Sequence, residues 1–411
     1  MKLLYDIGIY LADFHLKLIA PFNKKLKLGS DGRSETFQKL EKSVKTSDRT
    51  FWFHCASLGE YEQGLPVFKE LRQMFPEHKI ILSFFSPSGY EIRKNSEIAD
   101  VVVYLPIDTK SNAKRFVGLV HPELTIFVKY DIWPNYLLEL KRTKSRAILI
   151  SALFRKNQSY FKWYGDLMLK ALKSFDQIFV QNETSKTLLN SIGIEKVVIS
   201  GDTRYDRVSN QLEQDNNLPF IEEFKQNNLC VVIGSSWPAD EEILVKFINE
   251  NNHPNVKYII APHNIRSTQI ESLQKQIKSK TILFSDKLGK NLSDYNVFIV
   301  DTIGILSKVY SYAEIAYVGG AMGTTGLHNI LEPAVFGIPI IIGDNYQKFP
   351  EADAMIENKG VISVSNFNEL KETLNFLIKD NYKRQKMGKN NEQFILKNKG
   401  AIVQILNHLR I

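Results

Sequence analysis

Short apolar runs alternate with helical patterns along most of the chain. The runs that predict strands form two series, 51–55, 79–84, 101–104, 124–128, 146–150, 177–180 and 197–200, then 229–234, 257–261, 281–284, 297–300, 315–319 and 338–342. Short strands that alternate with helices are typical of βαβ units and a parallel sheet. The pattern therefore predicts an α/β protein with two Rossmann-like lobes and an active site in the cleft between them.

The two series are separated by a polar segment, 208–219, whose composition is typical of an interdomain linker. The length of 411 residues also exceeds what one hydrophobic core usually serves. We expect an N-terminal segment over 1–30, a first lobe over 31–210 and a second lobe over 219–411. The stretch 381–411 has a helical pattern, and its last helix is a candidate to pack back on the first lobe.

The N-terminal segment has an unusually apolar helical pattern. One face carries Leu4, Ile7, Leu11, Phe14 and Leu18, and a narrow opposite stripe carries Lys2, Asp6, Asp13 and Lys17. Such a helix buries its apolar face in protein or in a bilayer interface, where the lysines that follow would meet anionic lipid at about 1 kcal/mol each. Charges interrupt every long apolar run, so we expect neither a membrane span nor a cleavable signal peptide.

Composition narrows the function classes. The net charge is +8, and residues 1–50 carry half of this excess. Aromatic residues are only weakly interleaved with the basic ones, which argues against nucleic-acid binding. Cys55 and Cys230 lie in apolar runs without metal-ligand spacing, so we expect a reducing compartment and no disulfide framework. No metal-binding motif is present in the sequence.

Glu60 is the strongest candidate for catalysis in the first lobe. It follows the apolar run 51–55 and the tight turn 57–59, and it precedes a helical pattern. The carboxyl ends of strands in an open α/β sheet form the crevice where ligands bind, so this carboxylate is a candidate general base. The alternative is a first-turn glutamate that complements the helix dipole.

Two more charged residues follow strands of the first lobe. Asp131 precedes a Trp-Pro helix start, and Arg204 lies in the segment 201–206. A cation there is able to meet a nucleotide phosphate. For both residues the alternative is a structural ion pair.

The second lobe carries a Gly-rich turn over 319–326, after a strand and before a helix predicted from about His328. Backbone N–H groups in such a turn and at a helix N-terminus approach anions, so the segment is a candidate phosphate cradle. Glu332, one turn inside that helix, is placed to accept hydrogen bonds from ribose hydroxyls. The alternative is a flexible turn with a capping glutamate, because neither the dinucleotide fingerprint nor a P-loop is matched.

These segments, in this order, resemble the 3-deoxy-D-manno-octulosonic acid (Kdo) transferases of Gram-negative bacteria over nearly the whole chain. The resemblance is carried by His54-x-x-Ser-x-Gly-Glu60, Asp131-Ile-Trp-Pro-Asn135, Gly201-x-x-Arg-Tyr-Asp206, Gly234-Ser-Ser, Pro262-His263, Gly319-Gly and His328-Asn-x-Leu-Glu-Pro333. It also includes the N-terminal segment, which ends near Arg33.

The resemblance implies a GT-B glycosyltransferase that moves Kdo from CMP-Kdo to a lipid A precursor, lipid IVA. The reaction would invert configuration, use no metal or other cofactor, and take place at anionic lipid on the cytoplasmic face of the inner membrane. The family's base maps to Glu60, and its transition-state stabilisers map to Asp131 and Arg204. The donor contacts map to Ser235, Pro262, His263, Ile303, Gly304, Ile305, Asn329, Ile330, Leu331 and Glu332.

The chain departs from the family pattern at several positions. Lys129 and Asp131 stand where the family has two glutamates, His263 stands for an arginine, and Ile305 stands for a glutamate. Such exchanges change the reach and geometry of the contacts. Two rival functions stay open: another GT-B transferase with a different nucleotide-sugar donor, and an inactive membrane-associated binding protein.

Overall fold

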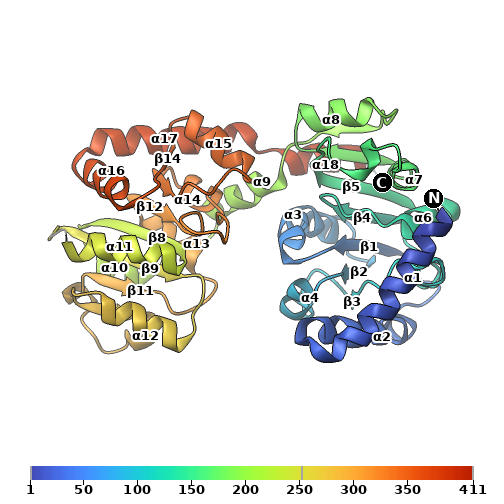
Figure 1. The fold of residues 1–411 in the computed structure, drawn as a ribbon, viewed down its shortest axis with the longest axis horizontal. Helices are drawn as coiled ribbons and strands as arrows, with labels where there is room; N and C mark the ends of the chain where they lie inside the picture. The colour runs from blue at the N-terminus through green and yellow to red at the C-terminus, as the bar shows by residue number, and fades with distance from the viewer. Residues whose placement is uncertain (1, 251–252, 410–411) are drawn as a thin grey trace. The chain divides into compact units, whose positions relative to one another are not determined.

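The computed structural model describes residues 2–250 and 253–409. The chain divides into two compact units: unit 1 is Met1–Asp206 with Lys399–Ile411, and unit 2 is Arg207–Asn398. Each unit contains one seven-stranded sheet, all of whose paired strands are parallel, flanked by helices (Figure 1). The predicted α/β fold with two parallel sheets is confirmed.

The sheet of unit 1 has the order β3-β2-β1-β4-β5-β6-β7. Its strands are β1 Thr50–Cys55, β2 Lys79–Phe84, β3 Val101–Tyr104, β4 Leu124–Val128, β5 Arg146–Ala152, β6 Gln177–Val180 and β7 Val197–Ile199. Alternate residues of β1 enter two different cores: Phe51 and Phe53 pack on one face, and Trp52 packs on the other. Both faces are therefore buried, which explains why these strands are continuous apolar runs.

The helices of unit 1 mostly connect successive strands. They are α1 Lys2–Ile19, α2 Lys24–Ser43, α3 Leu58–Met74, α4 Pro87–Arg93, α5 Lys110–Val120, α6 Pro134–Thr143, α7 Asp166–Leu172, α8 Glu183–Asn190, α9 Thr203–Ser209, which runs across the boundary into unit 2, and α18 Ala401–Leu409. Short 3₁₀ turns occupy Ala20–Phe22 and Ser159–Phe161. None of the described helices is long and apolar enough to cross a membrane.

Unit 2 repeats the plan with the order β10-β11-β9-β8-β12-β13-β14. Its strands are β8 Leu229–Ser236, β9 Val256–Pro262, β10 Thr281–Leu283, β11 Val297–Ile299, β12 Ile315–Val318, β13 Ile340–Ile342 and β14 Val361–Ser363. Its helices are α10 Pro219–Lys225, α11 Pro238–Glu250, α12 Ser267–Gln276, α13 Leu306–Val309, α14 Leu331–Ala334, α15 Pro350–Glu357, α16 Phe367–Lys379 and α17 Asn381–Asn398. The short edge strand β14 was not predicted.

The predicted C-terminal helix is two helices. Gly400 adopts φ 114° between α17 and α18, a left-handed conformation that suits glycine and ends α17. The carboxylate of Asp206 accepts hydrogen bonds from the backbone N–H groups of Gly400 (2.8 Å) and Ala401 (3.0 Å). At the other end of α18, Arg146 donates to the carbonyls of His408 and Leu409. These bonds hold α18 in unit 1.

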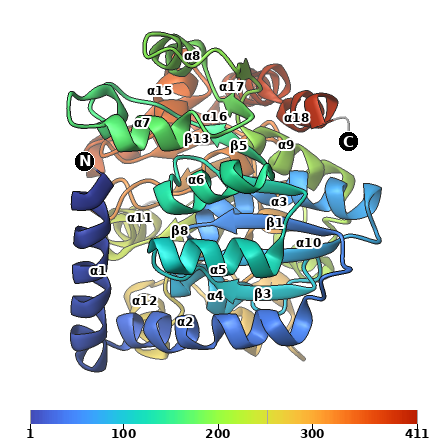
Figure 2. The ribbon, with the colours of Figure 1, turned by 90° about the vertical axis from the view of Figure 1, so that its right-hand side faces the viewer.

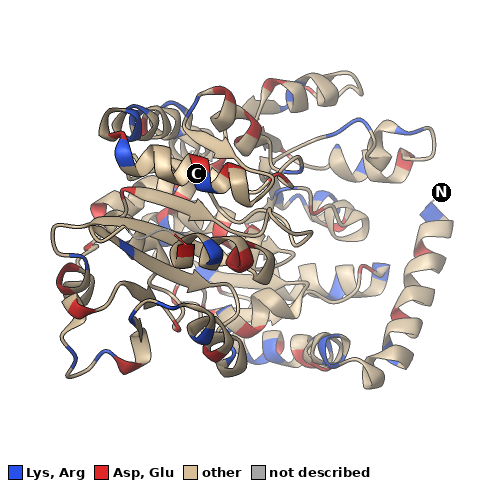
Figure 3. Ribbon diagram, turned by 60° about the vertical axis from the view of Figure 1, so that its left-hand side comes forward, with Lys and Arg blue, Asp and Glu red and all other residues tan. Residues whose placement is uncertain are grey.

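Helix α1 faces the rest of unit 1 with its acidic stripe. Tyr5 donates a hydrogen bond to Oδ2 of Asp108 (2.7 Å), and Nδ2 of Asn135 donates to Oδ1 of Asp6 (3.0 Å). The predicted apolar face is uncovered by the described residues, as the 59% exposure of Phe14 shows. Figure 2 shows α1 and α2 meeting at a sharp corner, and Figure 3 shows how few charged residues α1 carries.

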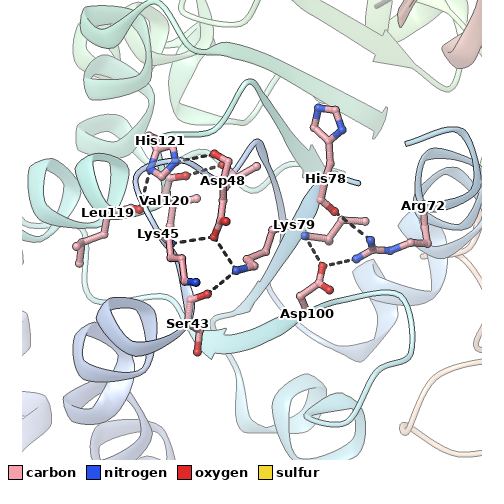
Figure 4. Close-up of polar contacts among 12 residues, drawn as sticks. Ser43, Lys45, Asp48, Arg72, His78, Lys79, Asp100, Leu119, Val120 and His121 are labelled. Carbon is pink, nitrogen blue, oxygen red and sulfur yellow. Dashed lines mark hydrogen bonds and ion pairs between the residues drawn. The ribbon is translucent and has the colours of Figure 1, made fainter. Parts of the chain in front are cut away.

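Charged residues at the amino edge of the unit 1 sheet form structural ion pairs and hydrogen bonds. Nζ of Lys79 donates to Oδ2 of Asp48 (2.6 Å), and Arg72 pairs with Asp100 (Figure 4). The hydrogen bond from Lys79 is the largest cause that lowers the pKa of Asp48. His121 bridges the carbonyls of Leu119 and Asp48. The polar groups at this edge therefore have hydrogen-bond or ion-pair partners within unit 1.

Candidate functional site

Glu60 lies in the first turn of α3, directly after β1. Oγ of Ser57, the N-cap residue, donates a hydrogen bond to Oε2 of Glu60. The carboxylate is partly exposed, and Oε1 receives no hydrogen bond from the residues that the structure describes. One oxygen is thus held in place while the other is available to accept a proton.

Asp131 follows β4, the strand next to β1, and contacts the fully buried imidazole of His54. Nε2 of His54 is 2.6 Å from Oδ2 of Asp131. Within the described parts of the chain, this buried oxygen has no hydrogen bond of good geometry. The indole N–H of Trp133 donates a hydrogen bond to the same His54 nitrogen at 3.1 Å. Nε2 of His54 is therefore approached by both the Trp133 N–H and the Asp131 carboxylate.

A buried hydrogen-bond chain holds the other ring nitrogen of His54, Nδ1, in place. The indole N–H of Trp52 can only donate, so Oγ of Ser83 accepts its bond at 2.7 Å. The hydroxyl of Ser83 is then able to donate to Nδ1 of His54, 2.8 Å away. The imidazole is thereby fixed on both sides, by Ser83 and by Trp133, with Nε2 2.6 Å from the Asp131 carboxylate. His54 therefore orients the side chain of Asp131.

Arg204 lies in α9, after β7, and is linked to the helix that carries Glu60. Its Nε donates to Oδ2 of Asp202 (2.8 Å), and Oδ1 of Asp202 accepts a bond from Nε2 of Gln63 (3.3 Å). Gln63 lies one turn after Glu60 on α3, and its carbonyl accepts a bond from Oγ1 of Thr203 (2.6 Å). The ion pair considered as the structural alternative is present, and it fixes the guanidinium relative to α3.

The carboxylates of Glu60 and Asp131 both affect the pKa of the buried Cys55 thiol, at the carboxyl end of β1. Burial raises its pKa well above the ordinary value, and the negative charges of Glu60 and then Asp131 raise it further. All three predicted catalytic residues follow strands at the carboxyl edge of one sheet, as the sequence pattern predicted.

In unit 2, buried Asp240 fastens the loop after β12 to the start of α11. Its oxygens accept bonds from the Tyr317 hydroxyl (2.8 Å) and from the backbone N–H groups of Gly320 (2.8 Å) and Trp237 (2.9 Å). Gly320 has φ 99°, and a Cβ there would lie 2.1 Å from the carbonyl oxygen of Gly326. The Gly-rich turn therefore has a defined shape that requires glycine.

Three stacked rings lie where β8, β9 and β12 end. The Trp237 and His263 rings stack with centroids 4.5 Å apart, and His263 and His328 are also 4.5 Å apart. Nε1 of Trp237 donates to Nε2 of His328 at 2.9 Å. Burial, aided by His263, lowers the pKa of His328 to about 4, and burial lowers the pKa of His263. Both imidazoles are neutral at pH 7 and offer hydrogen-bonding and stacking groups but no charge.

The predicted helix from His328 is wrong. Residues 326–330 are irregular, because Gly326 has φ 95° and the His328 N–H bonds the carbonyl of Gly319 (3.1 Å). Helix α14 begins at Leu331 and is four residues long, so Glu332 lies in its first turn. The helix contribution to a phosphate cradle is accordingly weaker than expected.

The other donor candidates differ in what they can offer. Ser235 lies at a bulge of β8 with φ 53°, and Pro262 ends β9. Residues 303–305 form the turn after β11, with Ile303 82% exposed. Nδ2 of Asn329 donates to Oε1 of Glu332 (3.1 Å). The side chains of 330 and 331 are buried, so only their backbone is available to a ligand.

Comparisons with known proteins bear on these features. Residues 31–207 match the family described as 3-deoxy-D-manno-octulosonic-acid transferase (kdotransferase). The 3-deoxy-D-manno-octulosonic acid transferase of Aquifex aeolicus (strain VF5) is 31% identical over 348 residues, which cover 82% of this chain and 88% of that protein. The chain belongs to the Kdo transferase family. It is a glycosyltransferase, as the sequence resemblance predicted.

Other relatives agree with this assignment. The Kdo transferase of Haemophilus influenzae is 28% identical over 87% of this chain and 86% of its own length. Among solved structures, the Neisseria meningitidis UDP-GlcNAc 2-epimerase has a TM-score of 0.62 at 16% identity, covering 88% of this chain and 99% of its own. MurG of Acinetobacter baumannii has a TM-score of 0.55 at 12% identity, with 88% and 98% covered. The predicted GT-B fold is confirmed.

The sequence analysis quoted His54 as part of a motif of the Kdo transferase family but gave it no role. It also missed Ser83, Gln63 and Asp202, which hold the candidate residues through hydrogen bonds. Only Asp202 had a signal, its place within the segment 201–206. The others lie in apolar strands or mid-helix, where a single polar residue gives no sign of its partner.

Proposed function

We propose that this Kdo transferase uses CMP-Kdo as its donor and a lipid A precursor, lipid IVA, as its acceptor. Unit 1 supplies the catalytic groups and receives the acceptor, and unit 2 holds the donor. The observation that carries this proposal is a carboxylate with one free oxygen on the same sheet edge as a second, histidine-bound carboxylate and an arginine.

Glu60 is the general base in this proposal. A sugar hydroxyl is too weak an acid to attack unaided, and a positioned carboxylate that takes its proton contributes about 10²–10⁴-fold. The Ser57 hydroxyl holds Oε2, which leaves Oε1 to receive the proton. A single displacement with inversion at the anomeric carbon needs one base and no covalent intermediate.

Arg204 and Asp131 stabilise the transition state. The leaving CMP gains negative charge, which a guanidinium fixed in advance stabilises without reorganisation. Asp131, oriented by His54, is placed to stabilise positive charge that develops on the sugar. Protein cations take the part that a divalent ion plays in other transferases. Among the described residues, no cluster of three or more His, Cys, Asp or Glu is arranged to hold a metal ion.

The donor contacts lie at the carboxyl ends of the strands of unit 2. Main-chain N–H groups of residues 321–325 bind the phosphate, because those of Gly319, Gly320 and Gly326 donate to other groups of the protein. Glu332 accepts bonds from the ribose hydroxyls. Because His263 and His328 are neutral at pH 7, they contribute hydrogen bonds and a stacking surface where the family commonly has an arginine. Ser235, Pro262 and residues 303–305 complete this surface.

Helix α1 brings the enzyme to its lipid acceptor. Its uncovered apolar face inserts into the interface of the inner membrane on the cytoplasmic side, and Lys24, at the start of α2, meets anionic headgroups.

The direct test is to incubate the purified protein with CMP-Kdo and lipid IVA and to analyse the lipid by mass spectrometry. The proposal predicts a product heavier by one or more Kdo residues, and competition by CMP but not by UMP. Transfer that UMP inhibits more strongly would favour a uridine donor, and absence of any product would favour a binding protein without activity.

A further inference from the structure

Arg33 on α2 is the feature of unit 1 that the proposed function leaves unexplained. Its Nε donates to the carbonyl of Leu105 (3.1 Å), its Nη2 donates to the carbonyl of Phe85 (2.6 Å), and the guanidinium lies 4.5 Å from the centre of the Phe85 ring. Burial lowers the pKa of Arg33. In the described parts of the chain no carboxylate forms an ion pair with it, unlike Arg72 or Arg93. Arg33 is partly buried, and the charge of Asp13, which forms its ion pair with Lys17, raises the pKa of Arg33. Charges removed from water are normally paired directly, so the guanidinium still has a place for an anion.

The guanidinium lines a cavity of about 680 Å³ in unit 1. Lys17 and Lys25 add two further positive charges to the lining, which also contains one carboxylate, Asp13, paired with Lys17 at 2.7 Å. Ser30, Ser34 and Ser86 contribute hydroxyls, and the remaining walls are mostly apolar side chains of α1, α2 and the loops after β2 and β3. Guanidinium, ammonium and hydroxyl groups together are the usual ligands of a phosphate.

A glycine makes room for this arrangement. Gly29 lies one turn before Arg33 and is buried, and a Cβ at this position would come 2.8 Å from Nη1 of Arg33. No hydrogen bond to Nη1 is formed by the described residues. Two of the guanidinium's nitrogens are therefore anchored to carbonyls, while the third is available for a ligand.

The cavity adjoins the turn that carries Glu60. Its wall includes Phe85 and Ser86, which follow β2, the strand paired with β1. The backbone N–H of Ser86 donates to the carbonyl of Ala56 at 2.8 Å, four residues before Glu60. On its other side the cavity is bounded by α1, whose outer face is apolar and uncovered by the described residues. A ligand here lies between a membrane-facing helix and the candidate base.

We propose that this cavity binds a phosphate group on the headgroup of the acceptor, an anionic amphiphile whose apolar part follows α1. Arg33 is the principal ligand, and Lys25 is the second. The proposal rests on the proposed function for the identity of the acceptor. An apolar wall beside three cations and one carboxylate, which leave an excess of positive charge, fits a phosphorylated lipid better than inorganic phosphate, which has no apolar part. Volumes of this order are common for ligand sites.

The test compares four variants: Arg33→Gln, Arg33→Lys, Lys25→Gln and the matched control Lys27→Gln. Lys27 is an exposed cation of the same helix that does not line the cavity. Transfer is measured with the phosphorylated acceptor and with the same acceptor after phosphatase treatment. We expect Arg33→Gln and Lys25→Gln to raise KM for the phosphorylated acceptor by about tenfold or more, because each loses a charge-assisted hydrogen bond. KM for the donor, and kinetics with the dephosphorylated acceptor, stay as in the wild type.

A second measurement keeps this inference separate from the proposed function. Binding of dodecyl phosphate, dodecyl maltoside and inorganic phosphate is measured directly, so it gives an answer even if no Kdo is transferred. We expect dodecyl phosphate to bind most tightly and to lose affinity in Arg33→Gln and Lys25→Gln but not in Lys27→Gln. If Arg33→Gln does not fold, Arg33→Lys and Lys25→Gln give the same comparison. Equal losses in Lys27→Gln, or equal binding of inorganic phosphate, would overturn the proposal.

Discussion

Replacing Asp108 by asparagine should change how the stability of unit 1 depends on pH. Asp108 is fully buried and receives three hydrogen bonds, from Tyr5 and from the backbone N–H groups of Asn135 and Tyr136. It joins α1 to the first turn of α6, directly after the Trp-Pro-Asn segment. Burial outweighs these hydrogen bonds and raises its pKa from 3.8 to about 7.

The sign follows from proton linkage. Between pH 4 and 7 the folded protein keeps the proton on Asp108, whereas the unfolded chain has lost it, so this group makes the folded state less stable as pH rises. A shift of three pH units corresponds to roughly 4 kcal/mol in all. From pH 5 to 8 the wild type should therefore lose about 3 kcal/mol relative to Asp108→Asn, which has no proton to release.

The measurement is urea unfolding of both proteins at pH 5 to 8 by tryptophan fluorescence. In a Trp237→Phe background the remaining tryptophans are Trp52, Trp133 and Trp163, all in unit 1, so the signal reports that unit alone. The free energy of unfolding of the wild type, measured relative to that of Asp108→Asn, should fall as pH rises and level off above about pH 8. A gap that is constant from pH 5 to 8 would refute the argument that burial dominates at Asp108.

Three further predictions follow from other contacts. His54→Asn should lower kcat for transfer at least tenfold, and His54→Gln should lower it less, because only glutamine places an N–H near Asp131. The control His78→Asn removes another buried histidine–carboxylate pair and should leave kcat unchanged. Equal effects of the two His54 variants would contradict the orienting role of His54. Phe14→Ser should reduce sedimentation with anionic vesicles severalfold without changing thermal stability, and undiminished sedimentation would argue against an interfacial α1. Gly320→Ala should weaken CMP binding by about tenfold or more, since its Cβ cannot fit the turn; calorimetric titration showing unchanged affinity would remove this turn from the donor site.

Much of the fold could be predicted from the sequence, because buried parallel strands are continuous apolar runs that end in turns. The predicted strands all exist within two residues of their expected ends. The three residues of β14 were missed because so short a run at a sheet edge carries little pattern. The helix after the Gly-rich turn was placed too early, since local sequence does not show that His328 bonds back to Gly319.

The sequence indicated the candidate catalytic residues but not the residues that hold them in place. Glu60, Asp131 and Arg204 stay predictions, and each was singled out because it follows a strand in a motif of the family. Their partners come from distant parts of the chain: His54 meets Asp131 across β1 and β4. The sequence did not show that Asp6 and Tyr5 of α1 would face the protein. Their partners, Asn135 and Asp108, lie far along the chain.

The measurement that tests the central claim most directly is single-turnover Kdo transfer by Glu60→Gln, with CMP-Kdo binding measured on the same preparation. Glutamine keeps the shape of the side chain and its bond to Ser57 but cannot accept the proton of the acceptor hydroxyl. The account predicts that transfer falls by about 10²–10⁴-fold while the affinity for CMP-Kdo is unchanged. Transfer at a rate near that of the wild type would show that Glu60 is not the base.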